Sequence, residues 1–447
     1  MLLICDHDFM AWLLVVIIGQ LNMKFILPWV GWPSFLALFF LFGEGLSTIS
    51  AQTADSFNPG VGNQVTCLGV QTDGKILVGG FLGGNLGGER RTAIGRVFSD
   101  GAIEGYFKPV LEYGLFSTAV QEDNKVVIGG YFTLARYTKE GLVDSSFQAT
   151  ISQGDPYPYV ACLVVQPDGK LIVGGEFRSL NGGSQRYFGR LHSNGALDSS
   201  FSTFLSGGVR AVALQPDGKM IISGSFTNLV APGQGNQPRH RVARLHSNGT
   251  LDTTFNAATP AAGSSTFFAV YCFALQPDGK ILTGGSFAKI GEQPCYSLGR
   301  LNTNGTLDSS FNAGSVFSGS EVNSLALQAD GKILVGARNR VVRLSSNGTQ
   351  DGFSAYALHQ NVVTPVQSIA LQPDGKILVA GVFTNLAGQT RTNIGRLNND
   401  TTATQSLIYT NNSVTWFRGG SSPEIWRAAF YFTTNDLEYT LLAACRT

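Results

Sequence analysis

The sequence predicts an all-β fold, a seven-bladed β-propeller with four-stranded blades, and three observations lead to this prediction. One motif occurs seven times, and the aspartates of its turn mark the copies at Asp73, Asp123, Asp168, Asp217, Asp278, Asp330 and Asp374. The copies follow one another at intervals of roughly 50 residues, the length of one four-stranded antiparallel unit. Helical periodicity of useful length is absent outside the N-terminal residues.

Each copy divides into four expected strands, which we name A to D. Strand A alternates large and small residues, as in Ser324–Gln328, and a Pro-Asp-Gly turn follows it. Strand B carries Lys-Ile-Leu-Val-Gly-Gly, and strand C ends in Gly-Arg-Leu, as at 299–301. A second tight turn then leads to Leu-Asp-Ser-Ser-Phe, which is the expected strand D.

The two ends of the repeat region complement one another. Seven strand-C arginines are present, but the last copy continues as Asn399–Thr402 and lacks its strand D. The missing piece, Asp55-Ser56-Phe57, comes before the first copy. We therefore predict that residues near 54–58 form the outer strand of the last blade, so that the N-terminal strand closes the ring without an open edge. The strand-D phenylalanines then also number seven: Phe57, Phe107, Phe147, Phe201, Phe255, Phe311 and Phe353.

The run QPDGKILVGGxF…RLNxNGTLDSSF resembles the delta-60 repeat, a tandem-repeat family of large exported bacterial proteins. The resemblance covers roughly residues 54–400, and it implies a β-propeller with no established biochemical activity. Two copies depart from the pattern, since Asn124 replaces the turn glycine in one and residues 336–339 lose the second glycine and the phenylalanine in the other. We expect those two blades to be less regular.

The ends of the chain and its charge suggest an exported protein of three parts. Residues 1–51 are interpreted as a leader whose signal peptide spans 23–51, residues 52–407 as the propeller, and residues 408–447 as the start of a truncated β-rich module. Residues 1–22 contain a second apolar run, interpreted as an over-extended reading frame, with a membrane anchor as the alternative. Thirty-one basic and 30 acidic residues give a net charge of +1, which argues against nucleic acid and anionic membrane surfaces as partners.

Several chemistry-bearing residues have a simpler structural interpretation. Cys67, Cys162 and Cys272 occupy one repeat position, so they are expected to be small strand-A residues and neither disulfides nor metal ligands. His192 and His246 flank equivalent turns and are not expected to act as bases. The turn aspartates lack the further oxygens that calcium needs. The strand-C arginines and the strand-D aspartates Asp144, Asp198, Asp252 and Asp308 are expected to join neighbouring strands by charge-assisted hydrogen bonds, one set in each blade. We predict no catalytic residue, no metal and no cofactor.

Loop length varies on one face of the predicted disc. The A–B and C–D turns keep their lengths, whereas the B–C and D–A loops vary, and variable loops on a repeating scaffold often carry recognition. We call this the variable face. Its candidate ligand-binding residues are Arg90, Arg91, Arg178, Gln185, Arg186, Tyr187, Arg239, His240 and Arg391 from B–C loops, and Tyr157, Tyr159, Phe267 and Phe268 from D–A loops. Alternatively, Arg91, Arg239 and Arg391 are a further repeat position that pairs within its blade.

These observations predict a secreted or cell-surface, non-catalytic binding module that is a monomeric ring and contacts an extracellular protein or glycan through the variable face. Two alternatives stay open. One is a propeller enzyme, such as a lyase, lactonase or glycan hydrolase, with its site at the channel mouth. The other is a structural spacer in a larger adhesin-like protein.

Overall fold

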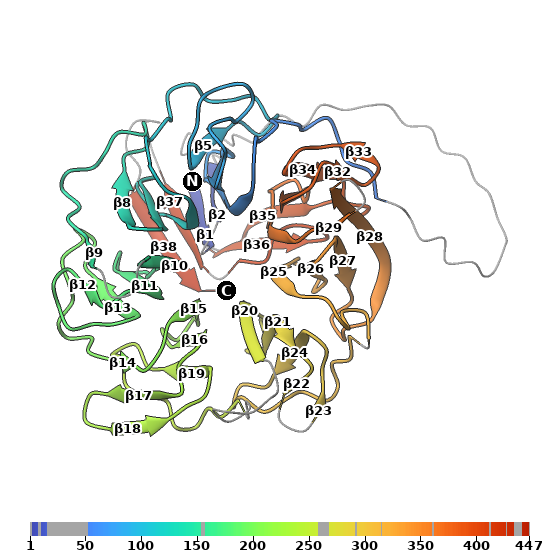
Figure 1. Cartoon of the computed structure of the whole chain (residues 1–447). Coiled ribbons are helices and arrows are strands. Elements are labelled where there is room, and N and C mark those ends of the chain that lie inside the picture. The colour runs from blue at the N-terminus through green and yellow to red at the C-terminus, as the bar shows by residue number, and fades with distance from the viewer. Residues whose placement is uncertain are drawn as a thin grey trace.

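The computed structural model describes residues 2–7, 10–15, 52–152, 157–257, 268–290, 293–313, 315–359, 362–410, 413–425, 427–432 and 440–446. Figure 1 shows antiparallel sheets arranged as a ring around a central axis. The innermost strand of each blade lies against that of the next, and the innermost strand of blade seven lies against that of blade one. The β-propeller predicted from the repeats is therefore present.

The blades share one sheet order, A-B-C from the axis outward. Blade one contains β3 (Val65–Val70), β4 (Ile76–Gly80) and β5 (Ile94–Val97), and blade two contains β6 (Leu115–Val120), β7 (Val126–Gly130) and β8 (Thr133–Tyr137). Blade three contains β10 (Tyr159–Val165), β11 (Leu171–Glu176) and β13 (Phe188–Leu191), and blade four contains β15 (Val209–Leu214), β16 (Met220–Gly224) and β19 (Val242–Leu245). Blade five contains β20 (Phe268–Leu275), β21 (Ile281–Phe287) and β24 (Leu298–Leu301). Blade six contains β25 (Val322–Leu327), β26 (Ile333–Ala337), β27 (Arg340–Leu344) and β28 (Gln350–His359), and blade seven contains β30 (Val366–Leu371), β31 (Ile377–Gly381) and β34 (Ile394–Leu397).

The expected fourth strand is complete only in blade six among the described residues. In blade three the D segment pairs with strand C at a single bridge, Leu191 to Leu197. The Phe201 N–H then donates to the Asp198 carbonyl at 3.1 Å, so the chain turns instead of extending the ladder. Blade six has one residue fewer before its phenylalanine, and there β28 pairs along β27. The prediction of four-stranded blades is thus too regular, because the Asp-x-x-Phe turn ends strand D early.

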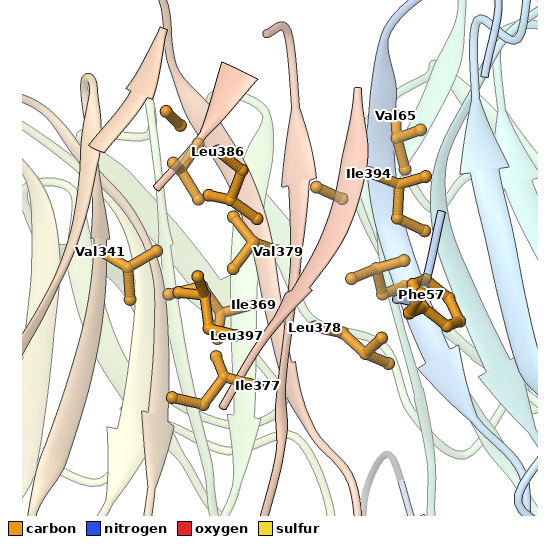
Figure 2. Close-up of a cluster of buried hydrophobic side chains, with 14 of the residues drawn as sticks. Phe57, Val65, Val341, Ile369, Ile377, Leu378, Val379, Leu386, Ile394 and Leu397 are labelled. Atoms are coloured by element: carbon orange, nitrogen blue, oxygen red, sulfur yellow. The ribbon is translucent and has the colours of Figure 1, made fainter. Parts of the chain in front are cut away.

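The segment before the first copy lies beside strand C of blade seven. Ala54 forms a bridge with Leu397, and the Asp55 N–H donates to the Arg396 carbonyl at 3.0 Å. Phe57 is fully buried in a hydrophobic cluster that also holds Leu378 of blade seven and Val65 of blade one (Figure 2). These contacts join the start of the repeat region to its last blade, at the place the sequence predicts.

Smaller strands lie outside the blade cores. On the variable face these are β9 (Ile151–Ser152), β12 (Ser179–Leu180), β14 (Phe204–Leu205), β17 (Asn228–Ala231), β18 (Gly235–Pro238), β22 (Lys289–Ile290), β23 (Gln293–Pro294), β29 (Val362–Val363), β32 (Asn385–Leu386) and β33 (Gln389–Thr390). The predicted signal peptide, residues 23–51, lies outside the described residues. Among the described residues, no helix has the length and hydropathy to span a membrane.

The C-terminal residues form two hairpins. β35 (Thr404–Thr410) pairs with β36 (Ser413–Gly419), and β37 (Arg427–Phe432) pairs with β38 (Thr440–Arg446). β37 also pairs with β1 (Leu2–His7), which pairs with β2 (Met10–Val15). After β36 the chain reaches the A–B turn of blade six, where the Ala329 N–H donates to the Ser422 carbonyl at 2.7 Å and the Glu424 N–H to the Leu327 carbonyl at 2.9 Å. This part of the expected C-terminal module therefore packs on the propeller.

Candidate functional site

The strand-C arginine builds the same cluster in every blade. In blade three the Arg190 Nε donates to the Asp198 carboxylate at 2.8 Å, and its guanidinium lies 4.6 Å from the centre of the Phe201 ring. The Lys170 ammonium reaches the same carboxylate at 3.0 Å. The other arginine–carboxylate pairs are Arg96–Glu104, Arg136–Asp144, Arg244–Asp252, Arg300–Asp308, Arg343–Asp351 and Arg396–Asp55. The predicted charge-assisted bonds between strands C and D are confirmed.

These clusters also join neighbouring blades. The Arg190 Nη1 donates to the Ser247 carbonyl of blade four at 2.6 Å, and the Arg300 Nη1 donates to the Ser346 carbonyl of blade six at 2.6 Å. Burial alone would raise the pKa of Asp198, but hydrogen bonds from Ser200 and Lys170 and the charge of Arg190 outweigh it and hold that pKa well below its usual range. The buried charges are therefore part of the scaffold and not a catalytic constellation.

The turn residues behave as the sequence predicts. The Asp73 carboxylate accepts the Lys75 N–H at 3.1 Å, and each of the other six turn aspartates makes the equivalent bond. Asn124 takes the left-handed φ of 60° that glycine supplies elsewhere. The His192 N–H closes its turn on the Ala196 carbonyl at 2.8 Å. These residues shape hairpins, and the interpretation of His192 as turn-flanking is confirmed.

The strand-A cysteines are packing residues between blades. Burial raises the pKa of the Cys67 and Cys162 thiols to about 12, so they stay protonated and unreactive near neutral pH. A Cβ built on Gly79 would lie 2.6 Å from the Cys67 Sγ, which explains the first glycine of the Gly-Gly pair. Ser117 occupies the same position in blade two, and its Oγ accepts the Leu163 N–H of blade three at 3.1 Å. The expectation of small structural residues is confirmed.

The long B–C loops of blades four, five and seven form hairpins. β12 of blade three pairs with β9, and β17 of blade four pairs with β14, so each of these two loops is paired to the preceding D–A segment. Each long loop also buries one aliphatic side chain, and these are Leu86, Leu180, Leu229, Ile290 and Leu386. Much of the length variation therefore serves blade packing.

Several candidate binding residues are part of that packing. Arg91 is only 2% exposed, and its guanidinium donates to the Phe107 carbonyl at 3.2 Å and the Glu104 carbonyl at 3.3 Å. The Arg391 guanidinium makes the matching bond to the Asp55 carbonyl, and Gln185, at the same repeat position, is buried. Arg91 and Gln185 are corrected from ligand contacts to structural contacts, because their side chains are buried in the blade. Arg391 is half-buried. Arg239, also at this position, is half-buried and donates to the Pro238 carbonyl at 2.7 Å.

The other candidates divide into exposed and half-buried residues. Arg90, Arg178, Arg186 and Tyr157 are exposed, whereas Tyr159, Tyr187 and His240 are half-buried. Tyr187 packs against the core shared by blades three and four, and its backbone has a positive φ of 68°. It is therefore more a structural residue than a surface contact. Phe267 and the side chain of Phe268 lie outside the described residues.

The variable face carries a group of aromatic side chains, of which Tyr157 alone was among the predicted candidates. Tyr113, Phe132 and Tyr157 are 46%, 38% and 64% exposed, and we call them the aromatic patch. Their ring centres lie 4.9 Å apart for Tyr113 and Phe132 and 6.3 Å apart for Phe132 and Tyr157. A second set of touching rings lies at the ends of the inner strands nearby, and it consists of Phe81, Phe116, Tyr131 and Tyr159.

A β-bulge occurs at the same place in strand A of every blade. In each one the pairing with strand B skips a single residue, which is left out of register. We call these seven residues the bulge ring, and they are Thr66, Phe116, Ala161, Arg210, Tyr271, Asn323 and Gln367. The residue before the bulge is always valine or leucine, and the residue after it is cysteine, serine or alanine. The bulge ring is thus variable between two repeating positions.

The bulge ring lines a central cavity of about 320 Å³, to which strand A of every blade contributes. Deeper in the cavity the lining is mainly aliphatic, with Phe273 and Thr118 among its residues. Pro423 lines it too, next to the A–B turn of blade six. Arg210 is the one charged residue among the described lining residues, and its guanidinium lies 4.6 Å from the centre of the Tyr271 ring.

The sequence shows that the bulge position varies, but it does not show that the residue is bulged or that it lines a cavity. Aligning the seven copies shows seven different residues one position before the cysteines, between neighbours that repeat. The alternation of residues along a strand does not show where a bulge occurs. The sequence therefore does not predict that this side chain lies at the central channel. The aromatic patch left a weaker signal, since its residues come from separate loops.

Comparison with known proteins identifies the repeats. The model of a family described as a domain of unknown function (DUF5122) beta-propeller matches residues 71–104, 121–147, 166–201, 215–255, 276–311, 328–352 and 372–402. A WD domain, G-beta repeat model matches residues 199–230 alone. No curated protein matches the sequence.

Solved structures share the fold at low identity. A streptogramin B lyase is 15% identical with a TM-score of 0.51, over 77% of this chain and 97% of that one. The extracellular domain of a one component system from B. thetaiotaomicron is 14% identical with a TM-score of 0.48, over 80% of this chain and 41% of that one. The WD40 beta propeller domain of Doa1 is 14% identical with a TM-score of 0.48, over 77% of this chain and 95% of that one. The lyase comparison supports the propeller fold and carries nothing further about activity.

Proposed function

The chain belongs to the DUF5122 beta-propeller family, and from that premise we propose that it is a non-catalytic binding module whose aromatic patch contacts an extracellular protein or glycan. The observation that carries the proposal is three exposed aromatic rings in contact on the variable face. Large aromatic side chains dominate the binding energy of interfaces, and they contribute area at low cost in conformational entropy.

The position of the patch supports a role in recognition. Tyr113 and Tyr157 come from the D–A loops before blades two and three, and Phe132 comes from the short B–C turn of blade two. In that turn Gly130 pairs with Thr133, which leaves no room for a hairpin like the one of blade four. Arg178 and Arg186, both exposed in the B–C loop of blade three, add positive charge to the same face.

We extend the proposal to location and architecture. The apolar segment between Met23 and Ala51 supports export, and the contacts of residues 54–57 with blade seven support a closed, monomeric ring. A closed ring has few open strand edges, which suits a module that works outside the cell without chaperones.

The cavity favours binding over catalysis. The described residues that line it include cysteines, serines and one arginine, but no histidine or carboxylate that could serve as a base. The raised pKa of the Cys67 and Cys162 thiols also argues against a cysteine nucleophile.

The test is a binding screen of the purified full chain against a glycan array and extracellular proteins. The Tyr113→Ala/Tyr157→Ala variant is expected to lose the ligands that the native chain binds. The matched control is Phe98→Ala/Tyr106→Ala, which removes two aromatic rings that are 39% and 88% exposed and follow strand C of blade one, away from the variable loops. Circular dichroism establishes that both variants are folded.

Equal loss in both variants, or retention in the patch variant, would remove the aromatic patch as the binding site. No binding by the native chain would contradict the proposal and favour the spacer interpretation.

A further inference from the structure

We propose that the bulge ring is a second binding site, which takes an acidic sugar into the central cavity through its carboxylate. This site is independent of the aromatic patch, because the residues of the bulge ring belong to the channel-lining strands and those of the patch to outer loops. An experiment can therefore exclude ligand binding at one of the two sites while the other still binds.

The bulge position lies outside the ladder of strands A and B, although the Thr66 Oγ1 and the Asn323 Nδ2 each donate to a carbonyl of the next blade. Its residue is skipped in the A–B pairing of every blade, and bulges commonly redirect a side chain away from the sheet next to a functional site. A packing role would make the position repeat, as it does for the valine or leucine before the bulge and the small residue after it. Seven blades instead present seven different side chains to one cavity.

Arg210 gives the cavity its preference for an anion. The Arg210 guanidinium lies over the Tyr271 ring, 4.6 Å from its centre, a cation–π contact that holds it at the cavity. The guanidinium N–H groups suit a carboxylate. Burial raises the pKa values of the Tyr159 and Tyr271 phenols. The charges of Glu176 and Glu321 add to this effect, and the charge of Arg210 opposes it. The mouth therefore carries both signs of charge, and a ligand carboxylate is best placed at Arg210.

The remaining residues of the bulge ring suit a sugar. Phe116 and Tyr271 offer ring faces for the apolar side of a pyranose. Asn323 donates through Nδ2 to the Val366 carbonyl at 3.2 Å, which holds the side chain and leaves its carbonyl oxygen as an acceptor for a hydroxyl group. Gln367 adds a second amide from the next blade. A cavity of about 320 Å³ is at the small end of ligand pockets, the size for one sugar or the end of a chain.

The C-terminal segment defines the inner end of the cavity. Pro423 lines it, and its neighbours Ser421, Ser422 and Ile425 are buried. Backbone bonds at Ser422 and Glu424 attach this segment to strand A and the A–B turn of blade six. Because the A–B turns mark the face opposite the variable loops, a ligand is expected to enter from the variable face.

Isothermal titration calorimetry of the full chain tests the site with D-glucuronate, D-galacturonate and N-acetylneuraminate, beside D-glucose and D-galactose. We expect at least one acid to bind at least about tenfold more tightly than the neutral sugars, the size of one charge-assisted hydrogen bond. Arg210→Ala and the size-preserving Arg210→Gln should both abolish that preference. Arg338→Ala, which removes an exposed arginine in the B–C turn of blade six, should keep it.

Three results would overturn the site: no binding of any of the acids, equal binding of acids and neutral sugars by the native chain, or unchanged acid binding in both Arg210 variants. The Tyr113→Ala/Tyr157→Ala variant should still bind the acid. If it lost the acid while the Arg210 variants kept it, the site would be the aromatic patch.

Discussion

The strand-C arginine and the strand-A bulge lie in the same repeat but differ in every respect. The arginine is present and buried in each of the seven copies, where it bonds to a carboxylate and lies against a phenylalanine ring. In blade three it also bonds to the next blade. The bulge residue differs in every copy and makes no ladder bond with strand B. Comparing these positions separates what the ring needs in order to fold from what it is free to vary, without any second sequence.

The comparison also changes how the variable face is understood. Variation in loop length predicts recognition, yet the long loops bury a leucine or isoleucine, and in blades three and four they pair with the preceding D–A segment. Variation in residue type at a fixed position is the sharper criterion, because length can change while a packing role persists.

Acid should produce the largest effect, since it acts on the arginine clusters together. Although burial alone would raise them, the pKa values of Asp198, Asp252 and Asp308 are held low by hydrogen bonds and nearby cations, and the pKa of Asp144 is lowered chiefly by its bond from Ser146. A lowered folded pKa contributes stability that is present above the unfolded value of about 4 and lost as pH falls below it. Urea midpoints should therefore fall steadily below about pH 4, and a constant midpoint down to pH 3 would contradict this account.

Substitution of a single strand-C arginine should have the second largest effect on stability. Arg190→Met is expected to lower the free energy of unfolding by about 3–5 kcal/mol, because it leaves the buried Asp198 carboxylate without its main partner. Arg210→Ala should change it by no more than about 0.5 kcal/mol, as a surface substitution away from packing does. Urea unfolding of both variants measures the contrast, and similar values for the two would remove the distinction between the positions.

Loss of the carboxylate of Asp55, at the junction of residues 54–57 with blade seven, should lower stability as much as loss of the equivalent carboxylate of blade three. Asp55 accepts hydrogen bonds from Arg396 at 2.7 Å and Lys376 at 3.1 Å. Asp55→Asn is expected to cost about 2–3 kcal/mol, as expected for charge-assisted bonds, and Asp198→Asn should cost about the same. If Asp55→Asn had no effect on urea unfolding, the segment would not be closing the ring.

The smallest expected loss of stability comes from a substitution in the packing of strand B against strand A. Gly79→Ala should cost about 1–3 kcal/mol, because its Cβ would meet the Cys67 Sγ at 2.6 Å. The double variant Gly79→Ala/Cys67→Ala should recover part of that loss, since it removes the clashing sulfur. Strict additivity in a double-mutant cycle would show that the thiol does not dictate the glycine.

The sequence predicted the propeller, the turn chemistry and the arginine–carboxylate pairs, because each of these repeats at fixed spacing. It overstated strand D, since the hydrogen bond that ends it early depends on backbone angles that composition does not reveal. It also placed Arg91, Gln185 and Arg391 on the binding surface. Arg91 and Gln185 are buried, and Arg91 donates to a carbonyl beyond the next turn. Arg391 is half-buried, and the carbonyl that it contacts comes from the other end of the repeat region.

By itself the sequence determined the repeating blade and the number of its copies. The turns and the arginine–carboxylate pairs within one repeat are contacts between residues that lie near one another in the chain. Only the tertiary structure decided where the bulge residues meet, which loops bring Tyr113, Phe132 and Tyr157 into contact, and how Pro423 comes to line the cavity. Those contacts join residues from different blades, and it is the arrangement of the blades around a central axis that brings them together.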